Sequence, residues 1–224
     1  GNGELFPLNG PMWSLFFEYI GNIPYALFIR RLSTKLLTLL VILLGILHSI
    51  FTIGNLSGYG NLGVGWTFDT INFCGGMLRM LFPFTLGMLI SRRFKAIKLP
   101  YSFLISSILL IATLSVPYLT AFKAINLNGI CEFFCIIAIF PLILTIGASS
   151  QEKSKLSQTL GELSYPLYII HYPIMYLFYQ WLIKTKQFTL SETYPVAILV
   201  VLLSVILAFT LSRLYDKPIR KRLH

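Results

Sequence analysis

The chain has 224 residues, of which 56% are hydrophobic and 12% are charged, and its mean hydropathy is +0.76. Soluble domains carry about 25% charged residues, so this composition excludes a soluble globular protein and predicts a chain whose solvent is lipid. The net charge of +10 comes from short basic clusters between apolar runs. No basic and aromatic stripe lies on a polar face, which excludes nucleic acid as a partner.

Seven apolar segments are long enough to cross a bilayer, which takes about 20 residues of helix. We expect them at 11–29, 35–53, 73–91, 101–119, 130–148, 164–183 and 194–213. The predicted fold class is all-α, a polytopic transmembrane helix bundle that forms a single membrane domain over 1–224. Residues 214–224 are expected to be a tail.

Basic residues alternate between the connections of this bundle. Fourteen of the eighteen Lys and Arg lie in the clusters 30–35, 92–98, 153–155 and 213–222. The opposite connections hold only Lys123, Lys184 and Lys186. The positive-inside rule then predicts an external N-terminus, an external loop 54–72 and a cytoplasmic C-terminus. The loop is rich in Gly and Asn. It could be a partly re-entrant lid or a flexible connection, and the sequence favours neither interpretation.

The first expected span contains a carboxylate, Glu18. A charged group at the bilayer centre costs about 2.5–3.5 kcal/mol on insertion scales, so it predicts a functional site. Ser14, four residues earlier, shares its helical face, and Trp13 is expected at the outer interface. Glu18 is therefore a catalytic candidate, with Trp13 and Ser14 as substrate-binding candidates. The alternative is a structural carboxylate that is protonated or hydrogen-bonded to a neighbouring helix.

Arg79 lies within the third expected span. Its planar guanidinium suits a carboxylate or a phosphate, so Arg79 is predicted to pair with Glu18 or to bind an anionic donor such as a coenzyme phosphate. A structural ion pair or snorkelling to the interface is the alternative.

The sixth expected span contains the densest polar patch of any span, at 164–173. Ser164, Tyr168 and His171 follow the helical i, i+4, i+7 spacing and are predicted to line one face. Pro173 frees a backbone carbonyl near His171. Ser164 and Tyr168 are substrate-binding candidates. His171 is a catalytic candidate, although a hydrogen-bonded packing histidine is the commoner case.

The remaining polar groups have simpler interpretations. His48 is interpreted as an interfacial histidine, and solvation accounts for Asp69, Glu132 and Glu162 near span ends. The three cysteines are odd in number and have no ligand spacing, so we expect neither a disulfide framework nor a metal site.

Four blocks of the sequence resemble, in order, those of the acyltransferase 3 family of integral-membrane O-acyltransferases. Residues 9–18 are similar to its Pro-x-Trp-Ser-Leu-x-x-Glu block, and 79–88 to its Arg-x-x-x-x-Phe-x-x-Gly helix. Residues 161–173 are similar to its Gly-x-x-Ser-Tyr-x-x-Tyr-x-x-His block. Residues 216–220 are similar to its closing Glu-Lys-Pro tail, with Asp216 in place of Glu.

The resemblance implies an acyltransferase in the bacterial plasma (inner) membrane. The donor would be acyl-CoA, most simply acetyl-CoA, and it would approach from the cytoplasm. No bound cofactor is expected. The acceptor would be a hydroxyl of an exported or cell-surface glycan, and lipid would be the other partner. Arg79 or Tyr168 would stabilise the developing oxyanion.

One departure from the family pattern matters. The family typically has about ten core helices, and the first carries a catalytic histidine that none of the seven expected spans contains. We therefore expect this chain to be the C-terminal portion of such an enzyme, incomplete without upstream helices that carry the main histidine.

Two other classes stay open on the residues alone. A membrane transporter would also place Glu, Arg and His near the midplane around broken helices, although no internal repeat is visible. A seven-helix receptor has the right number of spans but leaves the four blocks unexplained.

Overall fold

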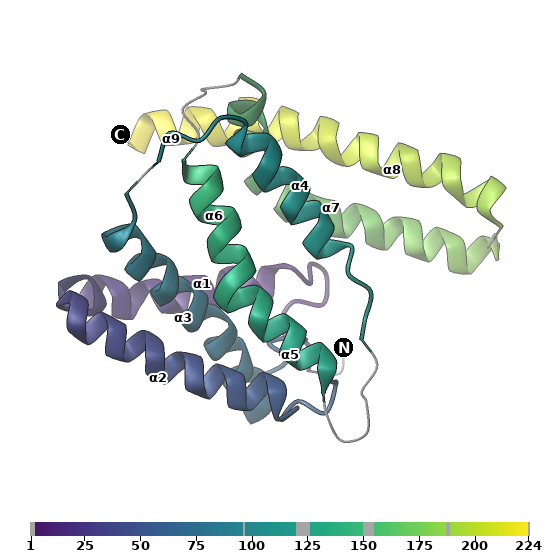
Figure 1. Cartoon of the computed structure of the whole chain (residues 1–224). Coiled ribbons are helices and arrows are strands. Elements are labelled where there is room, and N and C mark those ends of the chain that lie inside the picture. The colour runs from purple at the N-terminus through teal and green to yellow at the C-terminus, as the bar shows by residue number, and fades with distance from the viewer. Residues whose placement is uncertain (1–2, 96, 120–125, 150–154, 187–188, 224) are drawn as a thin grey trace. The chain divides into compact units, whose positions relative to one another are not determined.

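A computed structural model describes residues 3–95, 97–119, 126–149, 155–186 and 189–223, and helices dominate it (Figure 1). The bounds are α1 Met12–Leu27, α2 Thr34–Ile53, α3 Thr70–Arg93, α4 Ser102–Leu114, α5 Leu127–Phe134, α6 Phe140–Ala148, α7 Lys155–Thr185, α8 Leu190–Leu211 and α9 Lys217–Leu223. A 3-10 turn, Ile29–Arg31, follows α1, and π-helices at Cys135–Ile139 and Ser212–Asp216 follow α5 and α8. The described residues contain no strand, only an isolated bridge between Glu4 and Thr67. The all-α prediction is confirmed.

Each expected span coincides with a helix, but the lengths differ. Four helical segments are long and apolar enough to cross a membrane: Thr34–Ile53, Thr70–Arg93, Leu127–Ala148 and Leu190–Ile219. Helix α4 has 13 residues and ends at Leu114 instead of the expected 119. Pro117 accounts for this end, because a proline disfavours helical conformation in the residue before it. The expected tail 214–224 is helical from its start up to Leu223.

Both π-helices stand two residues ahead of a proline. Pro141 follows Cys135–Ile139, and Pro218 follows Ser212–Asp216. A proline inside a helix cannot donate to the carbonyl four residues earlier, and its ring crowds that carbonyl. Widening the turn to i→i+5 bonding relieves this conflict, and such bulges occur often at functional sites.

The polar residues next to several helices are caps. Ser33, Asp69 and Asn126 accept hydrogen bonds from the backbone N–H groups of Leu36, Asn72 and Gly129, at 3.3, 3.0 and 3.0 Å. The solvated interpretation of Asp69 was therefore incomplete, because this carboxylate begins α3. The hydrogen bond from the Thr67 hydroxyl, with that from the Asn72 backbone, holds the pKa of Asp69 below its ordinary value.

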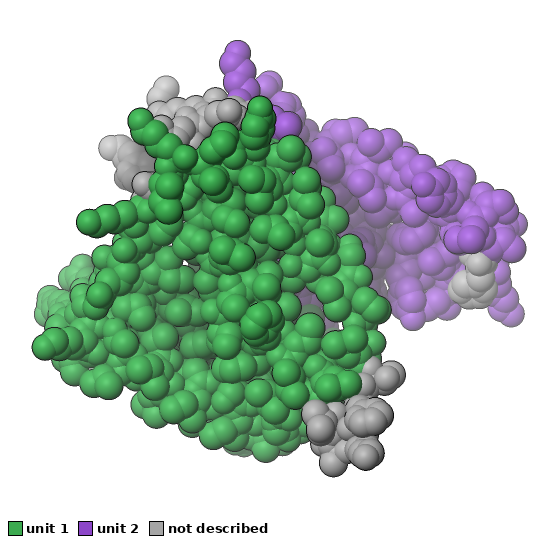
Figure 2. Space-filling view, in the orientation of Figure 1, with its two compact units in different colours: residues 1–5, 13–152 green, residues 6–12, 153–224 purple. Residues whose placement is uncertain are grey.

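The chain divides into two compact units, shown in Figure 2. Unit 1 comprises residues 1–5 and 13–152, and unit 2 comprises residues 6–12 and 153–224. In unit 1, α2 packs on α3 and on α5, and α4 packs on α6. In unit 2, α7 packs on α8. The single membrane domain over 1–224 stays a prediction, since compact units can share one membrane.

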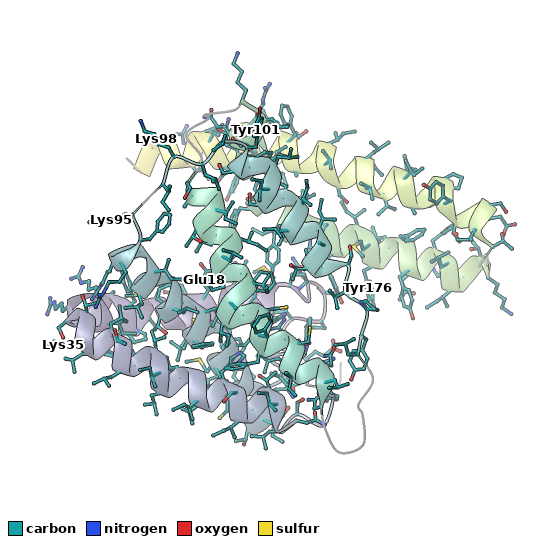
Figure 3. All side chains as sticks on the ribbon, in the orientation of Figure 1. Glu18, Lys35, Lys95, Lys98, Tyr101 and Tyr176 are labelled. Atoms are coloured by element: carbon teal, nitrogen blue, oxygen red, sulfur yellow. The ribbon has the colours of Figure 1, made fainter. Side chains whose placement is uncertain are left out.

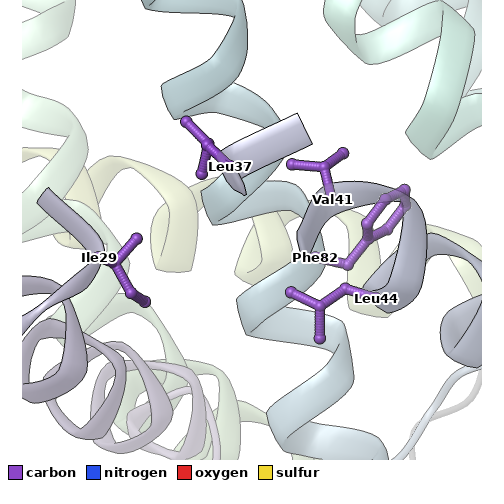
Figure 4. Packing of buried hydrophobic residues seen from close by; sticks show 5 residues of the cluster. All are labelled: Ile29, Leu37, Val41, Leu44 and Phe82. Atoms are coloured by element: carbon purple, nitrogen blue, oxygen red, sulfur yellow. The ribbon is translucent and has the colours of Figure 1, made fainter. Parts of the chain in front are cut away.

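The core of unit 1 lies where the 3-10 turn, α2 and α3 meet. Five buried apolar side chains form it, Ile29, Leu37, Val41, Leu44 and Phe82 (Figure 4). The three α2 residues are spaced by three and four, which puts them on one helical face. This cluster fixes α3, and with it Arg79, against α2.

The segment 54–69 is irregular and belongs to unit 1. Whether it is a partly re-entrant lid or a flexible connection stays a prediction. Val64 is fully buried, and the N–H of Gly65 donates to Asn72 Oδ1 at 3.0 Å. Gly65 has φ +110°, and a Cβ there would lie 2.6 Å from the Trp13 ring. Only glycine permits both this backbone conformation and this approach.

Candidate functional site

A polar cavity of about 470 Å³ lies in unit 1. Its walls come from segment 54–69, α3, the end of α4 with the residues after it, and the α5–π–α6 segment. The polar or ionisable lining includes Asn61, Arg79, Tyr118, Asn128, Cys131 and Glu132. Such a cavity within apolar helices is unusual, because polar groups at membrane depth are tolerated mainly where they line a cavity or find partners.

Arg79 is held at the cavity wall by an aromatic ring and a carbonyl. Its Cζ lies 4.5 Å from the centroid of the Trp13 ring, and its Nη1 donates to the Val64 carbonyl at 3.3 Å. Trp13 is buried, and the centroid of its ring lies 5.5 Å from that of Trp66. A cation over a Trp face is stabilised by the ring quadrupole, so the Trp13 ring and the Val64 carbonyl orient the Arg79 guanidinium beside the cavity.

Glu132 joins segment 54–69 to α5. Its Oε2 accepts from the backbone N–H of Leu62 at 2.8 Å, and its Oε1 accepts from Asn128 Nδ2 at 3.2 Å. The same Asn128 amide lies 3.2 Å from the Gly60 carbonyl. The interpretation of Glu132 as merely solvated was therefore wrong. The i, i+4 spacing of Asn128 and Glu132 is the signal that could have found this pair.

Helix α5 and the π-helix after it each contribute one thiol to the wall, Cys131 and Cys135. Cys131 and Cys135 both line the cavity and both are half-buried. Pro141 causes the widened turn, as described above. The cavity therefore borders a local departure from α-helical geometry.

His48 is a residue whose environment the sequence did not indicate. It is fully buried, not interfacial, and its ring packs against Phe82 and Phe133 at 5.1 and 5.8 Å between centroids. Its Nδ1 lies 3.3 Å from Thr52 Oγ1, and its Nε2 has no hydrogen-bond partner among the described residues. Its position on the α2 face that carries Leu37, Val41 and Leu44 accounts for the burial.

Glu18, which is labelled in Figure 3, is exposed on α1, one residue after the buried Phe17. Within the described residues its carboxylate makes no ion pair with Arg79 or with any other basic group. The predicted Glu18–Arg79 pair is therefore wrong. Ser14 is half-buried on the same helix. The roles proposed for Glu18, Ser14 and Trp13 in catalysis or substrate binding stay predictions.

Unit 2 contains a second, mainly apolar cavity of about 490 Å³ between α7 and α8. Ser164, Tyr168 and His171 line it together, as the helical spacing predicts. His171 Nδ1 lies 3.0 Å from the Leu167 carbonyl. Since a carbonyl only accepts, Nδ1 carries the proton in this arrangement. The roles of these three residues in substrate binding or catalysis stay predictions.

The segment 6–12 belongs to unit 2 and is hydrogen-bonded to α7. Asn9 Nδ2 donates to the Ile169 carbonyl at 2.9 Å. Pro173, four residues after Ile169, cannot donate to that carbonyl, so Asn9 satisfies it. Tyr168 Oη donates to the Pro11 carbonyl at 2.9 Å. The first sequence block is thereby joined to the block at 161–173.

The last two blocks are joined by a surface ion pair. Lys217 Nζ lies 2.7 Å from Glu162 Oε2, and both side chains are exposed. The hydrogen bond and charge of Lys217 hold the pKa of Glu162 below its ordinary value. The simple solvated interpretation of Glu162 was therefore incomplete.

A helical fold with membrane-spanning segments and a polar cavity defines an integral membrane protein with a site inside its helices. The described residues contain no group of three or more His, Cys, Asp or Glu that could hold a metal ion. The model of the acyltransferase 3 family, described as an acyltransferase domain, matches residues 1–213. The chain belongs to this family and is a membrane acyltransferase. No curated protein and no solved structure matches it significantly.

Proposed function

We propose that this membrane acyltransferase moves an acyl group, acetyl in the first instance, from acyl-CoA to a hydroxyl of an exported glycan. The acceptor hydroxyl loses its proton and attacks the thioester carbonyl, an ester forms, and the thiol of coenzyme A leaves. An alcohol is a poor nucleophile, so a base must take its proton. Glu18 and His171 are our candidates for that base among the residues of this chain.

The observation that carries the proposal is the polar cavity of unit 1. Amide, carboxylate, phenol and guanidinium groups line it together. This mixture of hydrogen-bond donors and acceptors suits a polyhydroxylated acceptor. Because the cavity is walled by segment 54–69, which the charge pattern assigns to the outer side, it supports an acceptor that approaches from outside.

Arg79 has the geometry to stabilise the reaction. Its position over Trp13 leaves a fixed positive charge at the cavity wall. Oxygen gains negative charge when the thioester carbonyl is attacked, and a preoriented donor lowers the energy of that state. Arg79 then binds the acyl oxygen through its guanidinium. Trp13 has a positioning role, since it holds that guanidinium.

The test is Arg79→Gln in the purified full-length protein, measured by acyl transfer and by release of the coenzyme thiol. Loss of one oxyanion donor lowers kcat by about 100-fold or more, with thermal stability close to that of the wild type. Arg213→Gln is a matched control, because Arg213 also lies over an aromatic ring, 4.2 Å from the Phe209 centroid. We expect the control to be active.

Two results would contradict the proposal. Full activity of a folded Arg79→Gln variant would remove Arg79 from the site. Solute flux in proteoliposomes, without transfer from any acyl-CoA tested, would instead favour the transporter class.

A further inference from the structure

Six basic side chains gather at one end of unit 1. They come from the turn between α1 and α2 with the first turn of α2, and from the end of α3 with the residues just after it. All six are exposed: Arg30, Arg31, Lys35, Arg92, Arg93 and Lys95. We call this set the basic clamp. Figure 3 labels Lys35 and Lys95 at this end. No Asp or Glu occurs within 19–68 or 70–131 of the sequence, so the clamp has no acidic residue near it along either chain segment.

Hydrogen bonds hold the two halves of the clamp together. Arg92 Nη1 donates to the Leu32 carbonyl at 2.7 Å, and Nη2 donates to the Arg30 carbonyl at 3.4 Å. Ile29, just before Arg30, is buried in the core with Leu37 and Phe82. The turn and the end of α3 are therefore fixed to each other by Arg92. The guanidinium groups of Arg30, Arg31 and Arg93 are exposed and can contact a ligand.

The clamp lies at the level where a bilayer ends. Helix α2 begins at Thr34 and α3 ends at Arg93, and both are apolar enough to span a membrane. Two large apolar side chains just before Arg30 in the sequence are exposed, Leu27 at the end of α1 by 61% and Phe28 by 55%. A ligand at this place meets positive charge and apolar surface together.

We propose that the basic clamp binds the phosphate group of an anionic phospholipid, whose acyl chains lie along Leu27 and Phe28. Guanidinium groups bind phosphate oxygens in pairs, and juxtamembrane basic residues attract anionic headgroups. The exposed apolar rim favours a lipid over a free nucleotide phosphate, which has no acyl chain to cover it. This site is separate from the polar cavity and does not depend on the proposed reaction.

The experiment measures binding of dioctanoyl phosphatidylglycerol to the detergent-purified protein by native mass spectrometry. The clamp variant is Lys35→Gln/Arg93→Gln, which spares the structural Arg92. The matched control is Lys155→Gln/Arg222→Gln, which removes one Lys and one Arg that are exposed in unit 2. Both double variants lower the net charge of +10 by two.

We expect the clamp variant to bind phosphatidylglycerol about 30-fold more weakly than the wild type, while the control changes the affinity less than about twofold. Dioctanoyl phosphatidylcholine, which has the same chains but no net charge, should bind weakly to all three proteins. Should the double variant fail to fold, Lys35→Gln alone is expected to lower the affinity about fivefold.

Equal weakening by the clamp variant and its control would overturn the proposal, because only net charge would then matter. Equal affinity for phosphatidylcholine would overturn it as well. Adenosine 3′,5′-bisphosphate serves as the free-phosphate probe. If the clamp variant has a lower affinity for this probe but an unchanged affinity for phosphatidylglycerol, the ligand is a soluble phosphate and the lipid assignment is wrong.

Discussion

Two alanine substitutions in α3 should behave in opposite ways. A Cβ at Gly76 would lie 2.6 Å from the Phe17 ring and 3.1 Å from the Cα of Gly65. A Cβ at Gly87 would meet nothing within 4 Å. The two glycines share one helix, so Gly87→Ala is a matched control for Gly76→Ala.

The magnitude follows from the overlap. Carbon atoms pack best at about 3.5–4.0 Å, so the new methyl group at Gly76 intrudes by about 1 Å. Phe17 is fully buried and cannot turn away into solvent. Overpacking of this kind costs about 1–3 kcal/mol. The helix-propensity gain of Gly→Ala is common to both variants, and it cancels when they are compared.

Thermal unfolding of the detergent-purified protein measures the difference. We expect Gly76→Ala to melt several degrees below Gly87→Ala, and Gly87→Ala to melt at or above the wild type. Because Gly65 lies against Trp13, which holds Arg79, Gly76→Ala should also lower acyl transfer by the full-length protein. If the melting temperature of Gly76→Ala equals or exceeds that of Gly87→Ala, segment 54–69 and α1 do not pack on α3 as described.

Two further predictions concern topology and the surface ion pair. In a variant without native cysteines, Tyr59→Cys should react with an impermeant maleimide on intact cells, whereas Lys98→Cys should react only after permeabilisation; the reverse pattern would refute the orientation taken from the charge pattern. The hydrogen bond and charge of Lys217 hold the pKa of Glu162 below its ordinary value. The pair therefore stabilises the fold at pH values above the ordinary pKa of a Glu carboxyl and loses its effect as pH falls through the depressed pKa. The melting difference between wild type and Lys217→Gln should therefore be present at pH 7 and disappear in acid, and a difference that does not change with pH would contradict this assignment.

The sequence determined the class and the local structure, because both depend on short-range properties. Apolar runs of helical length predicted the helices, and the spacing of Ser164, Tyr168 and His171 predicted their common face, which α7 shows. The position of Pro173 predicted a backbone carbonyl near His171 that no helical N–H group can reach. In the structure this is the Ile169 carbonyl, which accepts a hydrogen bond from Asn9. The four blocks indicated the family that the match over 1–213 establishes.

The tertiary structure decided which polar groups meet, because that depends on which helix faces pack together. Glu132 binds the backbone of Leu62, which is 70 residues away in the sequence. Arg79 lies over Trp13 from another helix instead of pairing with Glu18. His48 is buried because its face of α2 is covered by α3 and by Phe133. Sequence spacing gives the face of one helix, but not the partner that covers it.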